Sequence, residues 1–353
     1  MSWADVVGHQ IQIEMLHEAV RRRRLPHALL FAGPSGIGKQ IVARLLAKAL
    51  LCERTSDDDL HACGTCGSCR SFDAGTHPDC LAVEKPEGKA ILPIGLIAGE
   101  GDERGRSGLC YNLSLRPMLS GRKVAIVDDA DCMNAEAANA FLKTLEEPTP
   151  DTIIILISSQ PDSLLPTIRS RCQLLRFHPL KSGEVADLLV RLEWVDDPKA
   201  AEEIAALSDG SLSQAAQLLD PRWRDLRAML GKGLSAQAFE TGRFAAELLE
   251  QMESKASDAG ERRIAWSWLL RFAVEYYRKE LTELAREFAE FTPTDDSPGG
   301  VAACWGKLER VNQLLERCLD EESRRDDNLN ISLSLEAWLT DLAQLRRQEP
   351  AVR

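Results

Sequence analysis

Four cysteines lie close together in the sequence with a spacing that suits a metal ion. Cys63, Cys66 and Cys69 form two C-x-x-C steps that share Cys66, and Cys52 precedes them to complete a tetrad. Each step lets a tight turn direct two thiolates at one point, and Zn²⁺ takes four such sulfurs tetrahedrally. No His or Asp completes a water-activating site here, so the spacing predicts a closed, structural zinc. The alternatives are unrelated buried thiols or a redox C-x-x-C, which normally has two cysteines.

The segment upstream of these cysteines has the pattern of a phosphate-binding loop. Residues 33–39 fit G-x-x-x-x-G-K, and backbone N–H groups of such a loop cradle phosphates while Lys39 can reach the β- and γ-phosphate oxygens. Gln40 stands where Ser or Thr normally supplies a hydroxyl to Mg²⁺, so ATP or ADP binding stays open and efficient hydrolysis is not expected. The candidate nucleotide contacts in this segment are Gly33, Gly36, Gly38, Lys39 and Gln40.

Acidic residues follow the next predicted strand, 123–127. Asp128 stands at the strand end, where it can hold Mg²⁺ through water. An active ATPase of this architecture usually carries Glu at the next position, whereas Asp129 is one methylene shorter and a base must come within about 3 Å of its proton. With Asp131 nearby, the alternative is a solvated acidic loop. Gln40 and Asp129 together indicate a nucleotide fold that has lost catalysis.

The predicted strands are apolar throughout and alternate with helices. They are expected at residues 28–32, 123–127, 152–157 and 174–177. Asn134 can cap a helix over 135–147 that Pro148 stops. Apolar strands alternating with helices argue for a parallel sheet that is covered on both faces.

A helix end and a loop are expected to carry exposed charge. A helix over 10–24 carries its apolar face on Ile11, Met15, Leu16 and Val20 and ends in four arginines, which form either a phosphate patch or, more commonly, a solvated helix end. Residues 99–108 are rich in charge and glycine, which predicts an exposed, flexible loop.

The pattern changes near residue 181, where helical periodicity begins to dominate. We expect an α/β nucleotide-binding-like domain over 1–180 with a cysteine module at 52–69, a small helical domain over 181–225, and a helical bundle over 226–353. Breaks are expected near Gly210, Pro221, Gly231–Gly233 and 292–300. The bundle's packing tryptophans would be Trp266, Trp268, Trp305 and Trp338.

Composition narrows the class of protein. The chain has 353 residues, 44% of them hydrophobic and 28% charged, as in globular proteins of two or three domains. No apolar run approaches the ~18 residues of a membrane span. Ten cysteines, four of them in metal spacing, fit a reducing cytoplasm. A net charge of −12 gives no bulk attraction to nucleic acid, so any DNA contact must be local or made by a partner.

With these motifs in order, the chain resembles bacterial clamp-loader subunits, which are AAA+ proteins of DNA polymerase III. The resemblance is densest at 139–148 and 170–172, and it includes 27–34 and 74–79. It covers 1–180 strongly, 181–220 moderately, and the remainder only as a helical collar. It implies an AAA+ P-loop domain with an inserted zinc module, a small helical lid and an all-α collar.

Two kinds of loader subunit carry these motifs: the ATPase motor, called gamma or tau, and the delta prime subunit. Gln40 and Asp129 depart from the motor pattern. Residues 210–215 resemble the start of the motor's sensor-2 helix, but no arginine stands there to touch a γ-phosphate. The sequence also ends near residue 353 without the long Pro-rich tail of tau, although gamma can be short too. Together these features are expected to favour the delta prime type.

Within that resemblance, Arg171 is the residue expected to carry chemistry. The resemblance implies that Arg171 is an arginine finger, which acts in trans at the ATP of a neighbouring motor subunit. The alternative is a surface arginine paired with an acid, which is the more common role of a lone arginine. Ser158 or Ser159 matches the sensor-1 region. The implied partners are gamma/tau and delta subunits, with the sliding clamp and primed DNA reached through the complex in the cytoplasmic, nucleoid-associated replisome.

The leading hypothesis is therefore a non-motor component of DNA polymerase III with weak or no ATPase activity. Two other functions compete with it. The first is an active gamma/tau-type ATPase that tolerates Gln40 and Asp129. The second is a zinc-containing nucleic-acid-binding protein, which the charge and the lack of a basic, aromatic-interleaved strand disfavour. Cys80, Cys110 and Cys132 receive no role, although Cys80 could compete as a metal ligand.

Overall fold

The computed structural model describes residues 2–54, 60–86, 91–236, 240–256, 259–290, 298–323 and 330–347. The chain forms two compact units, Met1–Ala216 and Gln217–Arg353. The division into 1–180, 181–225 and 226–353 remains a prediction, and helix α11 (Pro221–Ser235) runs across the expected 225/226 boundary. In the described part of the chain, no helix combines the length and the apolar character that a membrane span requires.

A five-stranded parallel sheet forms the centre of the first unit, with the strand order β2-β3-β4-β1-β5. Its strands are β1 (Ala28–Ala32), β2 (Cys80–Val83), β3 (Lys123–Val127), β4 (Thr152–Ser158) and β5 (Gln173–Arg176). The parallel sheet and four of its strands match the sequence prediction. Strand β2, at the sheet edge, was not predicted, and none of its four residues is fully buried.

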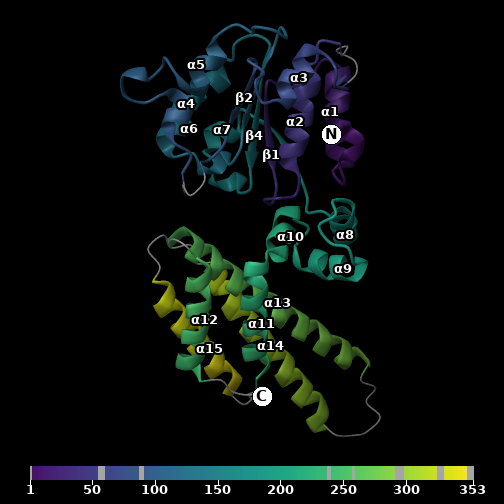
Figure 1. The fold of residues 1–353 in the computed structure, drawn as a ribbon, viewed down its shortest axis with the longest axis vertical. Helices are drawn as coiled ribbons and strands as arrows, with labels where there is room; N and C mark the ends of the chain where they lie inside the picture. The colour runs from purple at the N-terminus through teal and green to yellow at the C-terminus, as the bar shows by residue number, and fades with distance from the viewer. Residues whose placement is uncertain are drawn as a thin grey trace. The chain divides into compact units, whose positions relative to one another are not determined.

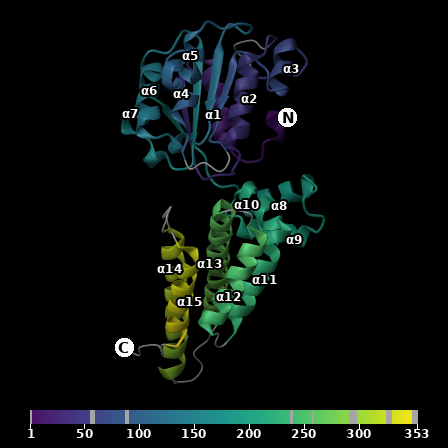
Figure 2. The same ribbon diagram turned by 60° about the vertical axis from the view of Figure 1, so that its left-hand side comes forward.

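Alternating side chains of the strands face two separate hydrophobic cores. Phe31 and Ile155 belong to one core, which α1, α2 and α3 cover; Leu30 and Leu156 belong to the other, which α4 to α7 cover (Figures 1 and 2). This is the pattern of a sheet buried on both faces. The helices are α1 (Gln10–Arg21), α2 (Lys39–Leu51), α3 (Gly67–Asp73), α4 (Ile94–Ala98), α5 (Gly108–Ser114), α6 (Ala135–Glu146) and α7 (Pro166–Arg169).

Helix α1 turns a different face to the core than the sequence suggested. Ile13 is buried with Leu16 and Val20, whereas Ile11 and Met15 are 69% and 51% exposed. The arginine run at its end is exposed, and both Arg21 and Arg22 pair with Glu18, as expected for a solvated helix end. The predicted loop at 99–108 is largely exposed and contains a 3-10 turn at Gly101–Glu103.

Helices continue from residue 182 to the end of the described chain. They are α8 (Ser182–Arg191), α9 (Pro198–Leu207), α10 (Leu212–Leu219), α11, α12 (Thr241–Lys255), α13 (Ala259–Glu290), α14 (Pro298–Ser323) and α15 (Ile331–Arg347). The expected break at Gly231–Gly233 is wrong, because α11 continues through both glycines. A Cβ on Gly233 would lie 2.0 Å from Cζ of Phe244, so this glycine permits close packing of α11 on α12.

The second unit is built around buried aromatic residues of the helical bundle. Trp266, Trp268 and Trp338 are buried, and the rings of Trp266 and Trp338 meet edge to face at 5.9 Å. The prediction for Trp305 is wrong, since it is 59% exposed. Its ring contacts Phe288 instead. An exposed tryptophan cannot be told from a buried one by helical spacing alone.

A buried carboxylate fixes the start of β3 next to β2. Asp79 is 0% exposed; its Oδ1 accepts from the backbone N–H of Met118 at 2.7 Å, and its Oδ2 accepts from Leu119 at 2.7 Å and Ser120 at 3.1 Å. Burial raises the pKa of this carboxyl, but the three backbone donors outweigh burial and hold the pKa below its ordinary value. The loop before β3 therefore folds around one charge.

We predict that Asp79→Asn lowers the free energy of unfolding by about 2 kcal/mol, because the amide offers one acceptor and places its own donors against backbone donors. Urea denaturation at pH 7 measures the loss. The folded-state pKa lies below that of the unfolded chain, so the wild-type advantage is present above about pH 4 and shrinks as the pH falls further. Asp162→Asn, at a 95% exposed side chain, is the control and should change stability little. Equal losses in both variants would contradict the prediction.

Candidate functional site

The carboxyl ends of the parallel strands bring the predicted nucleotide residues together. Gly33 follows β1, Asp128 follows β3, and Ser158 ends β4. The N–H of Gly33 donates to the carbonyl of Ser158 at 3.2 Å, which ties the phosphate loop to the neighbouring strand. The sheet therefore places Gly33, Asp128 and Ser158 at the same edge, and their roles in nucleotide binding stay a prediction.

Lys39 is held by the loop from which it extends. It is buried, and its Nζ donates to the carbonyls of Gly33 at 2.6 Å and Pro34 at 2.5 Å. Burial lowers the pKa of Lys39, and the negative charges of Asp128, Asp131 and Asp129 partly offset that effect. Two of the three N–H donors of this ammonium are therefore engaged by the loop itself.

The acidic residues at the end of β3 have separate structural tasks. Burial raises the pKa of Asp128, whose Oδ1 accepts from the N–H of Asp129 at 2.9 Å. Asp129 has a left-handed backbone with φ 48°. Asp131 accepts from the N–H of Ser159 at 3.1 Å and from its hydroxyl at 3.2 Å, so it secures the end of β4. Asp131 is thus not part of a solvated acidic loop.

Of two further predicted site residues, Ser158 is buried and Gln40 is exposed. Ser158 is fully buried, and its hydroxyl accepts from the N–H of Gln160 at 3.1 Å. Gln40 is exposed at the start of α2. Ser158 therefore already serves the turn that follows β4.

The start of α10 packs directly against the phosphate loop. The N–H of Leu212 donates to the carbonyl of Gly36 at 2.9 Å. A Cβ on Gly36 would lie 2.3 Å from Oγ of Ser211 and 2.5 Å from Cβ of Ser213. Sequence reasoning missed both serines as contacts of the loop, although the extra glycine in the loop, Gly36, marks where another backbone segment approaches.

The other side of the loop is closed by residues that the sequence did not single out. Nε2 of His9 lies 2.7 Å from the carbonyl of Ile37. A Cβ on Gly33 would lie 2.3 Å from the carbonyl oxygen of Phe177. The phosphate loop is therefore in contact with the N-terminal segment, the end of β5 and the start of α10.

Arg171 forms an ion pair with Glu146, a residue of the same unit. Nη2 is 2.5 Å from Oε1 of Glu146, and Nη1 donates to the carbonyl of Thr167 at 2.9 Å. The side chains of Arg171 and Glu146 are 35% and 48% exposed. Pairing with an acid was the alternative for this arginine, and the remaining exposure leaves the guanidinium accessible from solvent. A role in trans stays a prediction.

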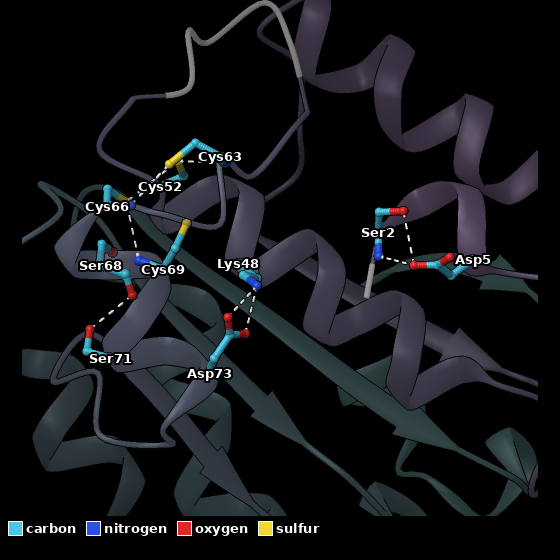
Figure 3. Close-up of polar contacts among 10 residues, drawn as sticks. All are labelled: Ser2, Asp5, Lys48, Cys52, Cys63, Cys66, Ser68, Cys69, Ser71 and Asp73. Atoms are coloured by element: carbon cyan, nitrogen blue, oxygen red, sulfur yellow. Dashed lines mark hydrogen bonds and ion pairs between the residues drawn. The ribbon is translucent and has the colours of Figure 1, made fainter.

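The four cysteines converge as their spacing predicted. The sulfurs of Cys52, Cys63, Cys66 and Cys69 all lie within 4.8 Å of one another (Figure 3). Those of Cys52 and Cys66 are 3.9 Å apart, and a tetrahedral ion with metal–sulfur bonds of about 2.3 Å needs sulfurs about 3.8 Å apart. The donor set is thus four sulfurs in a geometry that fits a tetrahedral metal ion.

Backbone N–H groups point at the sulfurs. Cys63 donates to Sγ of Cys52 at 3.4 Å, Cys66 to Sγ of Cys63 at 3.3 Å, and Cys69 to Sγ of Cys66 at 3.3 Å. Hydrogen bonds from Thr65 and Cys66 lower the pKa of the Cys63 thiol to about 6, whereas burial raises that of Cys69 to about 12. A bound cation would favour the thiolate of Cys69, which burial disfavours.

The cysteine module is fastened to the main core at several points. Lys48 of α2 pairs with Asp73 of α3 at 2.7 Å (Figure 3). The Ser68 hydroxyl donates to the carbonyl of Leu51 at 2.6 Å, so Nε2 of His77, also 2.6 Å away, must carry a proton and donate to it. These contacts connect α3, which contains Cys69, with α2 and with the segment before β2.

Comparison with known proteins agrees with the motifs. Residues 8–181 match the family described as "DNA polymerase III, delta subunit". The DNA polymerase III subunit delta′ of Pseudomonas aeruginosa is 39% identical over 219 residues, which cover 60% of this chain and 62% of that protein. The subunit delta′ of Bacillus subtilis is 35% identical over 219 residues, covering 62% of this chain and 61% of that protein. The chain therefore spans about three fifths of the length of these relatives.

More distant similarities extend to a second kind of subunit. The DNA polymerase III subunit tau of Escherichia coli is 30% identical over 286 residues, which cover 76% of this chain and 42% of that protein. A solved gamma subunit-related protein from Thermotoga maritima aligns over 95% of this chain and 100% of its own at 20% identity, with a TM-score of 0.37. The sequence relatives of this chain are thus DNA polymerase III subunits described as delta′ and as tau.

We predict that Gly36→Ala destabilises the first unit by about 2–3 kcal/mol, because the new methyl group collides with Ser211 and Ser213 in addition to straining a backbone with φ +74°. The matched control is Gly121→Ala, with φ +68° and nothing within 4 Å, which carries the backbone cost alone and should lose about 1 kcal/mol. Urea unfolding of both variants gives the two values. Similar losses would mean that α10 does not press on the loop.

Proposed function

We propose that the chain is a delta prime-type subunit of a clamp loader, because residues 8–181 match the family described as "DNA polymerase III, delta subunit" and the delta′ subunits of two bacteria are 39% and 35% identical to it. In this proposal it is a largely non-hydrolysing stator that assembles with gamma/tau and delta subunits in the cytoplasm, at the replisome. The complex loads the sliding clamp onto primed DNA. The chain itself supplies Arg171 to the ATP site of a neighbouring motor subunit.

The observation that carries the stator role is the contact of α10 with the phosphate loop. The N–H of Leu212 donates a hydrogen bond to the carbonyl of Gly36, and Ser211 and Ser213 fill the space beside Gly36. A motor of this family places an arginine of its sensor-2 helix at this point to touch a γ-phosphate, whereas this chain has short side chains there. Those short side chains allow close packing and offer no charge to a nucleotide.

The catalytic positions support the same proposal. Gln40 replaces the hydroxyl that normally binds Mg²⁺, and its side chain is exposed at the start of α2. Asp129 has a shorter side chain than the usual Glu and a left-handed backbone. Each departure removes a different requirement of ATP hydrolysis, namely metal binding and activation of water.

The second candidate is an active gamma/tau-type ATPase. It is favoured by the similarity to tau, which spans 76% of this chain, more than the delta′ alignments do. The phosphate loop and Lys39 are common to both candidates. The two differ in whether the isolated chain turns over ATP.

For the tetrad of Cys52, Cys63, Cys66 and Cys69, we infer a structural zinc site. Four thiolates leave no open coordination position for water, which is the mark of a structural site. The hydrogen bonds from Cys63, Cys66 and Cys69 to neighbouring sulfurs support bound thiolates. The zinc would hold the module between α2 and β2 in one conformation.

We predict that Arg171→Ala leaves the assembled clamp loader intact but lowers its DNA-stimulated ATP turnover about tenfold or more. Arginine fingers are worth about 10³–10⁵ in rate at a single site, and a complex with several sites shows part of that loss. Turnover is measured on loader reconstituted from gamma/tau, delta and this chain, with assembly checked by size-exclusion chromatography.

The isolated chain provides the control for this experiment and should not turn over ATP. Turnover by the isolated chain that disappears with Lys39→Ala would establish the motor alternative. Unchanged turnover of the complex with Arg171→Ala would remove the finger from the proposal.

We predict one zinc ion per wild-type chain, and none in Cys66→Ser, measured by elemental analysis of the purified protein. Free zinc at about a thousandfold its dissociation constant stabilises a native site by about 4 kcal/mol, so chelation should lower the melting temperature of the wild type but not that of Cys66→Ser. Cys80→Ser is the matched control, because Cys80 lies outside the tetrad and should keep the metal. Zinc loss in Cys80→Ser, or zinc retained in Cys66→Ser, would contradict this ligand set.

A further inference from the structure

The partner of Arg171 stands at a position that a helix does not favour for an acid. Glu146 is the last residue of α6, and Glu147 follows it as the C-cap. The C-terminal end of a helix carries partial negative charge, which disfavours carboxylates and favours Lys or Arg. Carboxylates at this end are therefore unfavourable with respect to the helix dipole, and the ion pair with Arg171 offsets that effect for Glu146.

Glu146 and Thr167 together define one direction for the guanidinium. Nη2 of Arg171 is 2.5 Å from Oε1 of Glu146, and Nη1 is 2.9 Å from the carbonyl oxygen of Thr167. A third contact, from Nη1 to Oγ of Ser170, is long at 3.5 Å. The guanidinium is thus held from one side by elements α6 and α7.

The held guanidinium keeps donors for a further ligand. Arginine has five N–H groups, and phosphate oxygens are typically bound by two of them in parallel. Among the described residues, none forms a hydrogen bond or ion pair with Nε of Arg171, and the single Nη2–Oε1 contact with Glu146 uses one of the two hydrogens of Nη2. An oxygen anion can therefore bind without displacing Glu146.

We propose that Glu146 is a positioning residue for Arg171, which it orients for a phosphate of a neighbouring subunit's nucleotide. This inference rests on the proposed function. An exposed arginine with a free side chain must give up its rotamer freedom when it engages a phosphate. Glu146 imposes that order beforehand, so its contribution falls on the catalysed step more than on folding.

A positioning role differs from an inhibitory role, in which Glu146 would hold Arg171 away from its ligand. If Glu146 sequestered the guanidinium, removing it would free Arg171 and raise turnover. The remaining exposure of Arg171, 35% of the side chain, and its unused donors favour positioning. A surface ion pair of this exposure also adds little to stability, so the two effects can be measured separately.

The test uses the reconstituted clamp loader with full-length wild-type chain, Glu146→Gln, Glu146→Asp, Arg171→Ala and the double variant. Glu146→Gln should lower kcat for ATP about fivefold to tenfold with little change in KM, because orientation acts on the transition state. Glu146→Asp, which keeps the charge, should recover part of the loss. In the Arg171→Ala background, Glu146→Gln should have no further effect.

The neighbouring pair of Arg169 and Asp162 supplies the matched control. Asp162→Asn removes another exposed carboxylate–arginine contact of the same segment, and it should leave kcat unchanged. Assembly and melting temperature should be the same in all single variants.

Three outcomes would overturn the inference and leave the finger itself standing: wild-type kcat in Glu146→Gln while Arg171→Ala is impaired, a raised kcat in Glu146→Gln, or losses that multiply in the double variant. Unchanged turnover in Arg171→Ala would instead remove the proposed finger, and the positioning role would fall with it.

Discussion

The parallel pairing of β1 with β4 on one side and β5 on the other determines where everything else in the first unit can lie. Leu30 pairs with Leu156 and with Leu174, so the loop that leaves β1 emerges between the ends of two other strands. The N–H of Phe177 donates to the carbonyl of Ala32 at 2.7 Å, just before the loop begins. Gly33 then passes so close to Phe177 that no side chain could be present, and the direction of the phosphate loop is set before any ligand is considered.

That constraint sets the shape of the loop without the side chains at 40 and 129. The shape depends on the sheet, on Gly33 and on Gly36, whereas the proposed loss of hydrolysis rests on Gln40 and Asp129. Lys39 illustrates the separation, because its ammonium is buried against the loop's own carbonyls, where it stabilises the loop without a phosphate. Scaffold and chemistry use neighbouring residues but different interactions.

The sequence contained most of the fold and part of the site. Apolar strands and the C-x-x-C steps are local patterns, so β1, β3, β4 and the sulfur cluster could be predicted from spacing. Strand β2 could not, because a short edge strand owes its structure to β3 and to the carboxylate of Asp79.

Contacts between distant segments were also beyond local patterns. The approach of Ser211 to Gly36 depends on how the chain returns after residue 207, and the pairing of Glu146 with Arg171 depends on two helix ends meeting. The prediction of the buried face of α1 was wrong for a related reason. Ile11 and Ile13 are equally apolar, and only packing in the folded unit decides which of them is buried.

Helix α6 joins the two places where chemistry is at issue. Its N-terminus is capped by Asn134 a few residues after Asp128, and its C-terminus carries Glu146 beside Arg171. At 1.5 Å per residue its twelve residues span about 18 Å, and buried Phe141 and Leu145 fix it to the sheet. The side chain of Arg171 is therefore tied to the sheet through α6, while its backbone follows α7. In the proposed function, the guanidinium that reaches a neighbour is thus oriented by contacts within this chain.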